Sequence, residues 1–274
     1  MNLRVTILLS TYNRAHFVLE TLQSIKNQTY ANWECIVIDD YSVDNTKVVI
    51  NEFIKDDSRF SYFLKTEKYN KGLSGSRNQG LDIAESRNAE FIQFFDDDDI
   101  MHPRKLELQI NPFLEDETLD VTFCKYRKFG DFKTINFDLE SAEDNSTNIL
   151  TNDLFWDFLY NNISLNSLGP IWKLSSIKNY KFDERLFTGE ERDFYLRIFF
   201  KENLNFKPVD KILFWYRKHK ESVTKGSFEK DKVYRKSLRL IRFKTYKMII
   251  FSRKVNFSQR VNFLIRFLKE IVRY

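Results

Sequence analysis

The chain has 274 residues, of which 42% are hydrophobic and 27 are phenylalanine, enough for one large domain or for one domain with a smaller appendage. Its two cysteines, Cys35 and Cys124, lie in apparent strands, which argues against a disulfide framework and favours a reducing compartment. No run approaches the roughly 20 apolar residues of a membrane-spanning helix, and the apolar residues 5–9 are too few for a signal peptide. We therefore expect an intracellular protein that is not integral to a membrane.

The net charge of +5 is distributed unevenly along the chain. Residues 229–274 contain 14 Lys or Arg and 3 Asp or Glu, a net +11, whereas the rest contains 30 and 36, a net −6. An acidic body thus carries a strongly basic tail, which bears on partners rather than on the fold.

Strand-like and helix-like patterns alternate through the first half. The apolar and β-branched runs are residues 5–9, 35–38, 60–64, 91–95 and 121–124. Residues 18–25 have helical spacing, and further helices are predicted at 46–54, at 75–86 and after Pro103. This alternation predicts βαβ units and a doubly wound, mostly parallel α/β sheet.

Polar clusters follow three of the predicted strands, at residues 10–14, 39–40 and 96–99. Because the carboxyl ends of parallel strands meet at one edge of a sheet, we expect these clusters to converge. The four successive aspartates of 96–99 repel one another unless a cation lies among them, and carboxylate oxygens suit Mg²⁺ and Mn²⁺. An isolated acidic run would be a solvated turn, but its position after a buried strand favours a metal–phosphate site.

Four segments, in this order, carry a resemblance to a known family. They are residues 5–14, which end in Ser-Thr-Tyr-Asn-Arg; residues 36–44; residues 71–80, Lys-Gly-Leu-Ser-Gly-Ser-Arg-Asn-Gln-Gly; and residues 94–100, followed by Pro103. Together they resemble the family 2 glycosyltransferases with the GT-A fold, over about residues 3–225. The resemblance implies metal-dependent, inverting transfer from a nucleotide-diphosphate sugar in bacterial surface-polysaccharide synthesis.

The first strand ends are the expected donor site. Asp40 suits a base N–H, although it also fits a turn, Tyr12 offers a ring for stacking, and Ser10 offers a small hydroxyl. Arg77 lies in the glycine-rich segment, where its guanidinium suits oxyanions, and Arg14 is assigned to the same nucleotide-sugar site. A UDP-sugar is the favoured donor.

The family's Asp-X-Asp metal motif, aligned back from Pro103, falls on Asp96, Asp97 and Asp98. The resemblance implies that Asp98 coordinates Mn²⁺ or Mg²⁺ and that Asp96 reaches the ribose or a metal-bound water. Asp97, assigned to the nucleotide-sugar site, and Asp99 leave the register open by one residue. Bound metal would stabilise the departing nucleotide.

The second half is expected to supply the catalytic base. Residues 182–197 resemble the family's catalytic segment, and counting back from Arg197 puts Glu191 where relatives carry an aspartate. Glu190 and Asp193 are the alternative bases. The same charges would also suit the first turn of an amphipathic helix.

Residues 215–224 resemble an Arg-X-His-X-X-Ser segment that closes over the diphosphate. His219 is the candidate third metal ligand, with Arg217 or Lys220 pairing with phosphate. The polar, irregular residues 130–150 are predicted to form an insertion or mobile loop beside the acceptor.

The resulting expectation is a catalytic domain at 1–228, with a donor half at about 1–125 and an acceptor half at about 126–228.

The tail at 229–274 is predicted to form basic amphipathic helices. Apolar residues recur at helical spacing at Val261, Leu264, Ile265, Leu268, Ile271 and Val272, and in an earlier set at Tyr234, Leu238, Ile241, Thr245, Met248 and Ile249. Such helices are attracted to anionic bilayers, which would place a cytoplasmic enzyme on the inner face of the membrane beside a saccharide or lipid-linked acceptor. Packing on the catalytic domain is the alternative, and nucleic acid has no role in this reading.

Two other functions compete with this one. A nucleotidyltransferase would need a glycine-rich phosphate loop after the first strand, and residues 10–14 are not one. A non-catalytic sugar-nucleotide or membrane-binding module would have little reason to carry Asp96, Asp98, Glu191 and His219 together.

Overall fold

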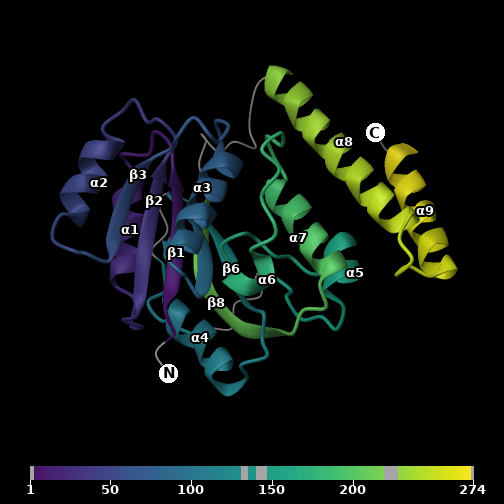
Figure 1. The fold of residues 1–274 in the computed structure, drawn as a ribbon, viewed down its shortest axis with the longest axis horizontal. Helices are drawn as coiled ribbons and strands as arrows, with labels where there is room; N and C mark the ends of the chain where they lie inside the picture. Colours follow the sequence, from purple (N-terminus) through teal and green to yellow (C-terminus); the bar gives the residue numbers. More distant parts are fainter. Residues whose placement is uncertain (1–2, 131–134, 140–146, 219–227, 273–274) are drawn as a thin grey trace. The chain divides into compact units, whose positions relative to one another are not determined.

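A computed structural model describes residues 3–130, 135–139, 147–218 and 228–272 of the chain (Figure 1). It divides into two compact units. The first comprises residues 1–184 and 190–225, and the second comprises residues 185–189 and 226–274. The predicted boundary after residue 228 lies near this division, which also assigns residues 185–189 to the second unit.

The first half of the first unit is a parallel βαβ arrangement, as the alternating pattern predicts. Its elements are β1 (Val5–Thr11), α1 (Val18–Lys26), β2 (Trp33–Asp39), α2 (Thr46–Ile54), β3 (Phe60–Leu64), α3 (Leu73–Ser86) and β4 (Phe91–Asp96). Strands β3, β2, β1 and β4 lie side by side in that order, and all three pairings between them are parallel.

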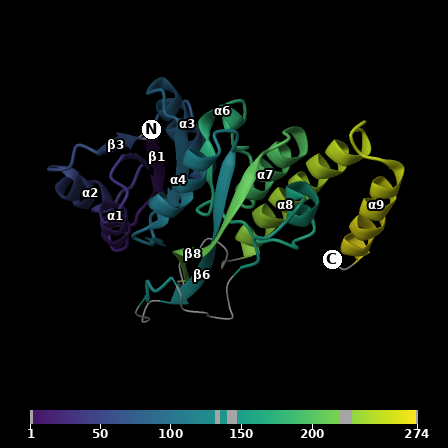
Figure 2. The ribbon, with the colours of Figure 1, turned by 90° about the horizontal axis from the view of Figure 1, so that it is seen from below.

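Strands β1 and β2 are buried along their whole length because helices cover both faces of the sheet. On one face, Ile7 and Val37 join α1 residues such as Leu22 in the main apolar cluster. On the other face α3 approaches closely, since a Cβ on Gly80 would lie 3.4 Å from the Leu8 side chain. Figure 2 shows α1 and α2 on one side of these strands and α3 on the other, the arrangement of a doubly wound sheet.

The second half is a mixed sheet, and here the sequence prediction was incomplete. Its elements are β5 (Ile100–Met101), α4 (Lys105–Glu115), β6 (Val121–Gly130), α5 (Leu154–Leu159), β7 (Ile171–Lys173), α6 (Leu174–Ile177), α7 (Glu190–Lys201) and β8 (Phe206–Lys218). Within the described residues these strands extend the sheet to the order β3-β2-β1-β4-β7-β6-β8-β5. β7 is antiparallel to both β4 and β6, whereas β6 and β8 are parallel with a register shift between Cys124 and Tyr126. The strand predicted at 121–124 therefore continues to Gly130.

The second unit contains α8 (Phe228–Ile250) and α9 (Phe257–Val272). Tyr246 of α8 and Phe267 of α9 bring their ring centroids to 5.5 Å, so the two helices pack as a hairpin. In the ranges that the structure describes, no helix has both the length and the hydropathy needed to cross a bilayer.

Candidate active site

The predicted polar clusters converge at one edge of the sheet because of the strand register. Ser10 of β1 is paired with Ile38 of β2 on one side and with Asp96 of β4 on the other, and Thr11 is paired with Asp39. Asp40 and the aspartates after Asp96 therefore emerge on either side of the end of β1. This is the carboxyl edge, where open α/β sheets bind ligands.

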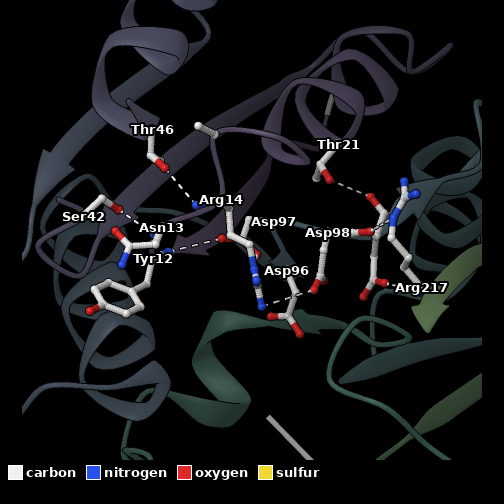
Figure 3. A network of polar contacts seen from close by, with 12 residues as sticks. Tyr12, Asn13, Arg14, Thr21, Ser42, Thr46, Asp96, Asp97, Asp98 and Arg217 are labelled. Carbon is white, nitrogen blue, oxygen red and sulfur yellow. Dashed lines mark hydrogen bonds and ion pairs between the residues drawn. The ribbon is translucent and has the colours of Figure 1, made fainter. Parts of the chain in front are cut away.

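The segment after β1 holds the aspartate run by direct contacts (Figure 3). The Tyr12 N–H donates to Asp97 Oδ2 at 3.2 Å. The Arg14 guanidinium lies 3.5 Å from an Asp97 carboxylate oxygen and 3.8 Å from one of Asp98. Burial, followed by the neighbouring Asp98 charge, raises the pKa of Asp97 to about 8. Arg14 is thus one of the cations that pair with these carboxylates.

Asp99 is fully buried and anchors the aspartate segment from behind. Its Oδ1 accepts the Arg217 N–H at 2.7 Å, and its carbonyl accepts the Thr21 hydroxyl at 2.8 Å. Burial, with the Asp98 charge second, raises the pKa of Asp99 well above its ordinary value. Asp99 faces the protein interior, so it is poorly placed to bind a metal at the surface of the site. Asp96 and Asp98 keep the most exposed carboxylates of the run, with 23% and 17% of their side chains accessible.

The placement of Arg217 differs from the phosphate-pairing role that the sequence suggested. Only 5% of the residue is exposed. Its Nε donates to the Asp98 carbonyl at 2.8 Å, its terminal nitrogen pairs with Glu20, and its guanidinium lies over the rings of Phe17 and Phe129. Arg217 therefore ties the end of β8 to the aspartate segment. His219 and Lys220, the other residues named in that segment, lie outside the described residues.

The carboxylates of Asp96 and Asp98 could bind a divalent cation if phosphate and water oxygens supplied its remaining ligands. Burial raises the pKa of Asp96, and the adjacent Asp98 charge adds to the rise while Arg77 opposes it. A bound cation would relieve this repulsion. Among the described residues, no three His, Cys, Asp or Glu side chains are grouped as a metal site. Mg²⁺ usually takes one or two carboxylates plus phosphate and water oxygens, which matches two aspartates beside a diphosphate.

Arg77, which the sequence assigned to the nucleotide-sugar site, is buried, and its guanidinium contacts acidic side chains of the protein. Only 1% of the residue is exposed, and one terminal nitrogen donates to Asp96 Oδ1 at 2.9 Å and to Ser167 Oγ at 2.8 Å. The other terminal nitrogen lies 3.4 Å from Glu190 Oε1. The side chain is long and the start of α3 is deeply packed, so the charge is satisfied inside the protein. Arg77 therefore connects the metal-motif aspartate to the start of α7.

Asp40 is held by a buried lysine that the sequence gave no reason to single out. The Lys65 ammonium pairs with the Asp40 carboxylate and donates to the Asn70 carbonyl at 2.8 Å. The Gly72 N–H donates to the other carboxylate oxygen of Asp40 at 2.6 Å. Gly72 has a φ of +113°, which glycine adopts readily and other residues rarely do. The Asp40 carboxylate is thereby fixed at the strand edge before any ligand arrives.

Tyr12 and Ser10 also lie at this edge. Tyr12 is 41% exposed, and the Lys71 ammonium lies 4.8 Å from the centroid of its ring. Its exposed ring is compatible with stacking on a base. Ser10 is buried between β2 and β4.

The first turn of α7 brings three candidate bases into different surroundings. Glu191 Oε2 accepts the Ser167 N–H at 3.0 Å. Burial raises the pKa of Glu190 to about 7. The Arg77 charge opposes this rise, and the Glu191 charge adds to it. Asp193 is buried and accepts from Arg197 Nε at 2.8 Å, so it has a structural partner within its own helix. Ser167 lies in a loop without any sequence signal, yet it contacts both Arg77 and Glu191.

Residues 6–179 match the family model "Glycosyl transferase family 2". The chain belongs to this family. Among curated relatives, an Escherichia coli UDP-Glc:alpha-D-GlcNAc-diphosphoundecaprenol beta-1,3-glucosyltransferase, WfgD, is 40% identical over 48% of this chain and 47% of its own length. This glycosyltransferase chain thus spans about half the length of that relative. A Campylobacter jejuni GalNAc(5)-diNAcBac-PP-undecaprenol beta-1,3-glucosyltransferase is 29% identical over 89% of this chain and 78% of its own length.

Solved structures show the same GT-A fold for this family member. TarS of S. aureus in complex with UDP-GlcNAc superposes with a TM-score of 0.71 at 20% identity, over 97% of this chain and 72% of that one. A Pyrobaculum calidifontis mannosyltransferase in complex with GDP-Man and Mn²⁺ gives a TM-score of 0.57 at 15% identity, over 89% and 71%. The fold expected from the four ordered segments is confirmed.

Proposed function

We propose that the protein is a metal-dependent, inverting glycosyltransferase that moves a sugar from a UDP-sugar to a lipid-linked saccharide. The observation that carries the proposal is the convergence of three groups at the sheet's carboxyl edge. Asp40 suits a base N–H, Asp96 and Asp98 suit a metal on a diphosphate, and Glu191 stands at the first turn of α7. Arg77 and Ser167 connect the second group to the third.

Glu191 is the proposed general base. Its carboxylate takes the proton from the acceptor hydroxyl while that oxygen attacks the anomeric carbon, and the bond from this carbon to the nucleotide diphosphate breaks. Attack on the face opposite the leaving group inverts the configuration. The Ser167 N–H fixes one carboxylate oxygen of Glu191, which leaves the other oxygen for the acceptor. Glutamate reaches one methylene farther than the aspartate that the family resemblance implies here.

Asp98 is the proposed metal ligand, with Asp96 as its helper. A bound Mn²⁺ or Mg²⁺ would neutralise charge on the departing nucleotide diphosphate. The protein's own contribution is to hold the two carboxylates in place. Arg77 fixes Asp96, and Arg217 fixes the backbone of Asp98.

The donor and acceptor classes rest on the relatives. TarS was solved with UDP-GlcNAc, and the E. coli and C. jejuni relatives are named for undecaprenyl-diphosphate-linked substrates. An acceptor of this type resides in a membrane, so we place the enzyme on the inner face of the cell membrane as a peripheral protein, in cell-surface polysaccharide synthesis.

The test is nucleotide release from UDP-sugars in the presence of Mn²⁺ and a polyprenyl-diphosphate-linked saccharide. We expect Asp98→Ala to lower kcat/KM at least 100-fold, and to abolish the thermal stabilisation by UDP that depends on Mn²⁺. We expect Glu191→Gln to retain that stabilisation and to lose transfer. Glu52→Gln, an exposed glutamate outside the site, is the matched control. Full activity of Asp98→Ala would refute the metal assignment, and a binder that never releases nucleotide would refute the enzyme.

A further inference from the structure

Helix α9 carries more apolar surface than its packing uses. Phe263 is buried, and its ring lies 5.5 Å from that of Phe267, which in turn packs against Tyr246 of α8. This is the face that holds the helical hairpin together. Val261, Ile265 and Leu268, which belong to the apolar set identified in the sequence, lie outside this face.

A second apolar face of α9 is exposed. Phe257, Val261, Ile265 and Leu268 follow one another at spacings of 4, 4 and 3 residues, so they form one stripe along α9. Each of them is between 36% and 81% exposed. A continuous exposed apolar stripe of this kind marks a surface that contacts something apolar.

The turn between α8 and α9 combines the same apolar character with positive charge. Phe251 and Phe257, at its two ends, are 76% and 81% exposed, more than any other aromatic side chain described in this unit. Arg253 and Lys254 lie between them and are also exposed. Residues 229–274 together carry a net +11. An apolar partner with negative charge at its surface matches both properties.

We propose that the α9 stripe of Phe257, Val261, Ile265 and Leu268, with Phe251, Arg253 and Lys254 of the adjoining turn, docks the protein on an anionic lipid bilayer. The helix lies in the plane of the interface, with its apolar stripe among the acyl chains and its cations at the headgroups. A second copy of the chain would cover the apolar stripe but would repel the exposed cations. This inference rests on the proposed transfer to a lipid-linked acceptor. Docking through α9 would bring the enzyme to the membrane that holds this acceptor.

The experiment measures sedimentation of the full chain with sucrose-loaded vesicles of phosphatidylcholine alone or mixed with phosphatidylglycerol. We expect binding to the anionic vesicles only, weakened by high salt. Ile265→Ser/Leu268→Ser should lower the vesicle affinity at least tenfold and leave the circular dichroism unchanged, because both side chains are exposed. Arg253→Gln/Lys254→Gln should also weaken binding and should reduce its salt dependence.

Val48→Ser/Leu114→Ser is the matched control. It removes comparably exposed apolar side chains from the first unit, so vesicle binding should persist. Failure of the wild type to bind anionic vesicles, or equal binding by Ile265→Ser/Leu268→Ser, would overturn the proposal. So would a wild-type dimer that dissociates in this variant without any vesicle binding.

A second readout separates this inference from the proposed function. The stripe variant should keep transfer to a water-soluble, short-chain acceptor and lose at least tenfold on a vesicle-embedded polyprenyl-linked acceptor. Equal loss on both acceptors would contradict a membrane role. If the wild type transferred sugar to neither acceptor, the proposed enzymatic function would be refuted. The vesicle-binding experiment would still test the docking surface.

Discussion

Lys65→Met should destabilise the protein strongly, because it removes one partner of a buried ion pair. Lys65 is completely buried, and its ammonium pairs with the Asp40 carboxylate and donates to the carbonyls of Asn70 and Gly72 at 2.8 and 3.4 Å. Methionine fills a similar volume without any charge or donor. The substitution therefore leaves Asp40 as a buried carboxylate without its cation.

The expected cost is about 3–5 kcal/mol in the free energy of unfolding, the usual penalty for breaking a buried pair. For a unit of this size, about 1 kcal/mol corresponds to about 2–4 °C in Tm, so Tm should fall by about 10 °C. Because Asp40 loses its fixed position, the KM for the donor should also rise more than kcat falls.

Urea unfolding of four proteins checks the reasoning. They are the wild type, Lys65→Met, Asp40→Asn and the double variant. Removing both charges should recover at least about 2 kcal/mol relative to the sum of the single losses. Lys68→Met, an exposed lysine paired with Asp82 at 2.9 Å, is the control and should cost under about 1 kcal/mol. A loss below about 1 kcal/mol for Lys65→Met, or strictly additive losses, would refute the argument.

Three further predictions concern the neighbouring elements. Glu190 has a pKa raised by burial from 4.5 to about 7, so its protonated form is favoured by folding and stability falls as pH rises from about 4.5 to 7. The loss of unfolding free energy over this pH range is up to about 3 kcal/mol. Urea titrations at several pH values should show a smaller pH dependence for Glu190→Gln than for the wild type, and an equal pH dependence would contradict the prediction. Gly75→Ala should cost about 3 kcal/mol, because a Cβ would lie 2.1 Å from the Asn70 carbonyl oxygen; a normal melting temperature would be incompatible with this contact. Arg217→Met should weaken UDP binding in Mn²⁺ and leave metal-free UDP binding unchanged, measured by calorimetry, because it releases the carbonyl of Asp98; equal weakening in both conditions would indicate general unfolding instead.

The sequence predicted the fold best where local pattern and tertiary environment agree. Residues 91–95 are apolar except for Gln93 and do not alternate in polarity, which is typical of a strand buried on both faces, and β4 has that environment. β7 was missed because it is short and β8 because its polarity is mixed, so neither shows a continuous apolar run. In α9 the helical spacing was predicted and the packed face was left open, since the periodicity of a helix with two apolar faces does not show which one packs.

The positions of the polar residues at the sheet's edge were predicted to a similar extent. Strand ends and charge clusters indicated residues 39–40 and 96–99, because sheet topology brings such ends together, and the family resemblance implied the roles of Asp96 and Asp98. The contacts of Arg77 could not be predicted, since a cation in a glycine-rich segment suits a phosphate as well as a buried carboxylate. Lys65 and Ser167 act through single contacts whose partners are distant in sequence, and no local pattern marks such residues.

The pairing of Ser10 with Ile38 and Asp96 has a consequence for donor choice. Neighbouring strands in a sheet are about 4.8 Å apart, so the ends of β2 and β4 are separated by two such steps, about 10 Å. Backbone hydrogen bonds across β1 fix this separation, and no side-chain rearrangement alters it. The sheet therefore fixes the distance between Asp40, the proposed partner of the base, and Asp96 and Asp98, the proposed partners of the metal and diphosphate. The distance between base and diphosphate would therefore select the donor nucleotide independently of the sugar that it carries.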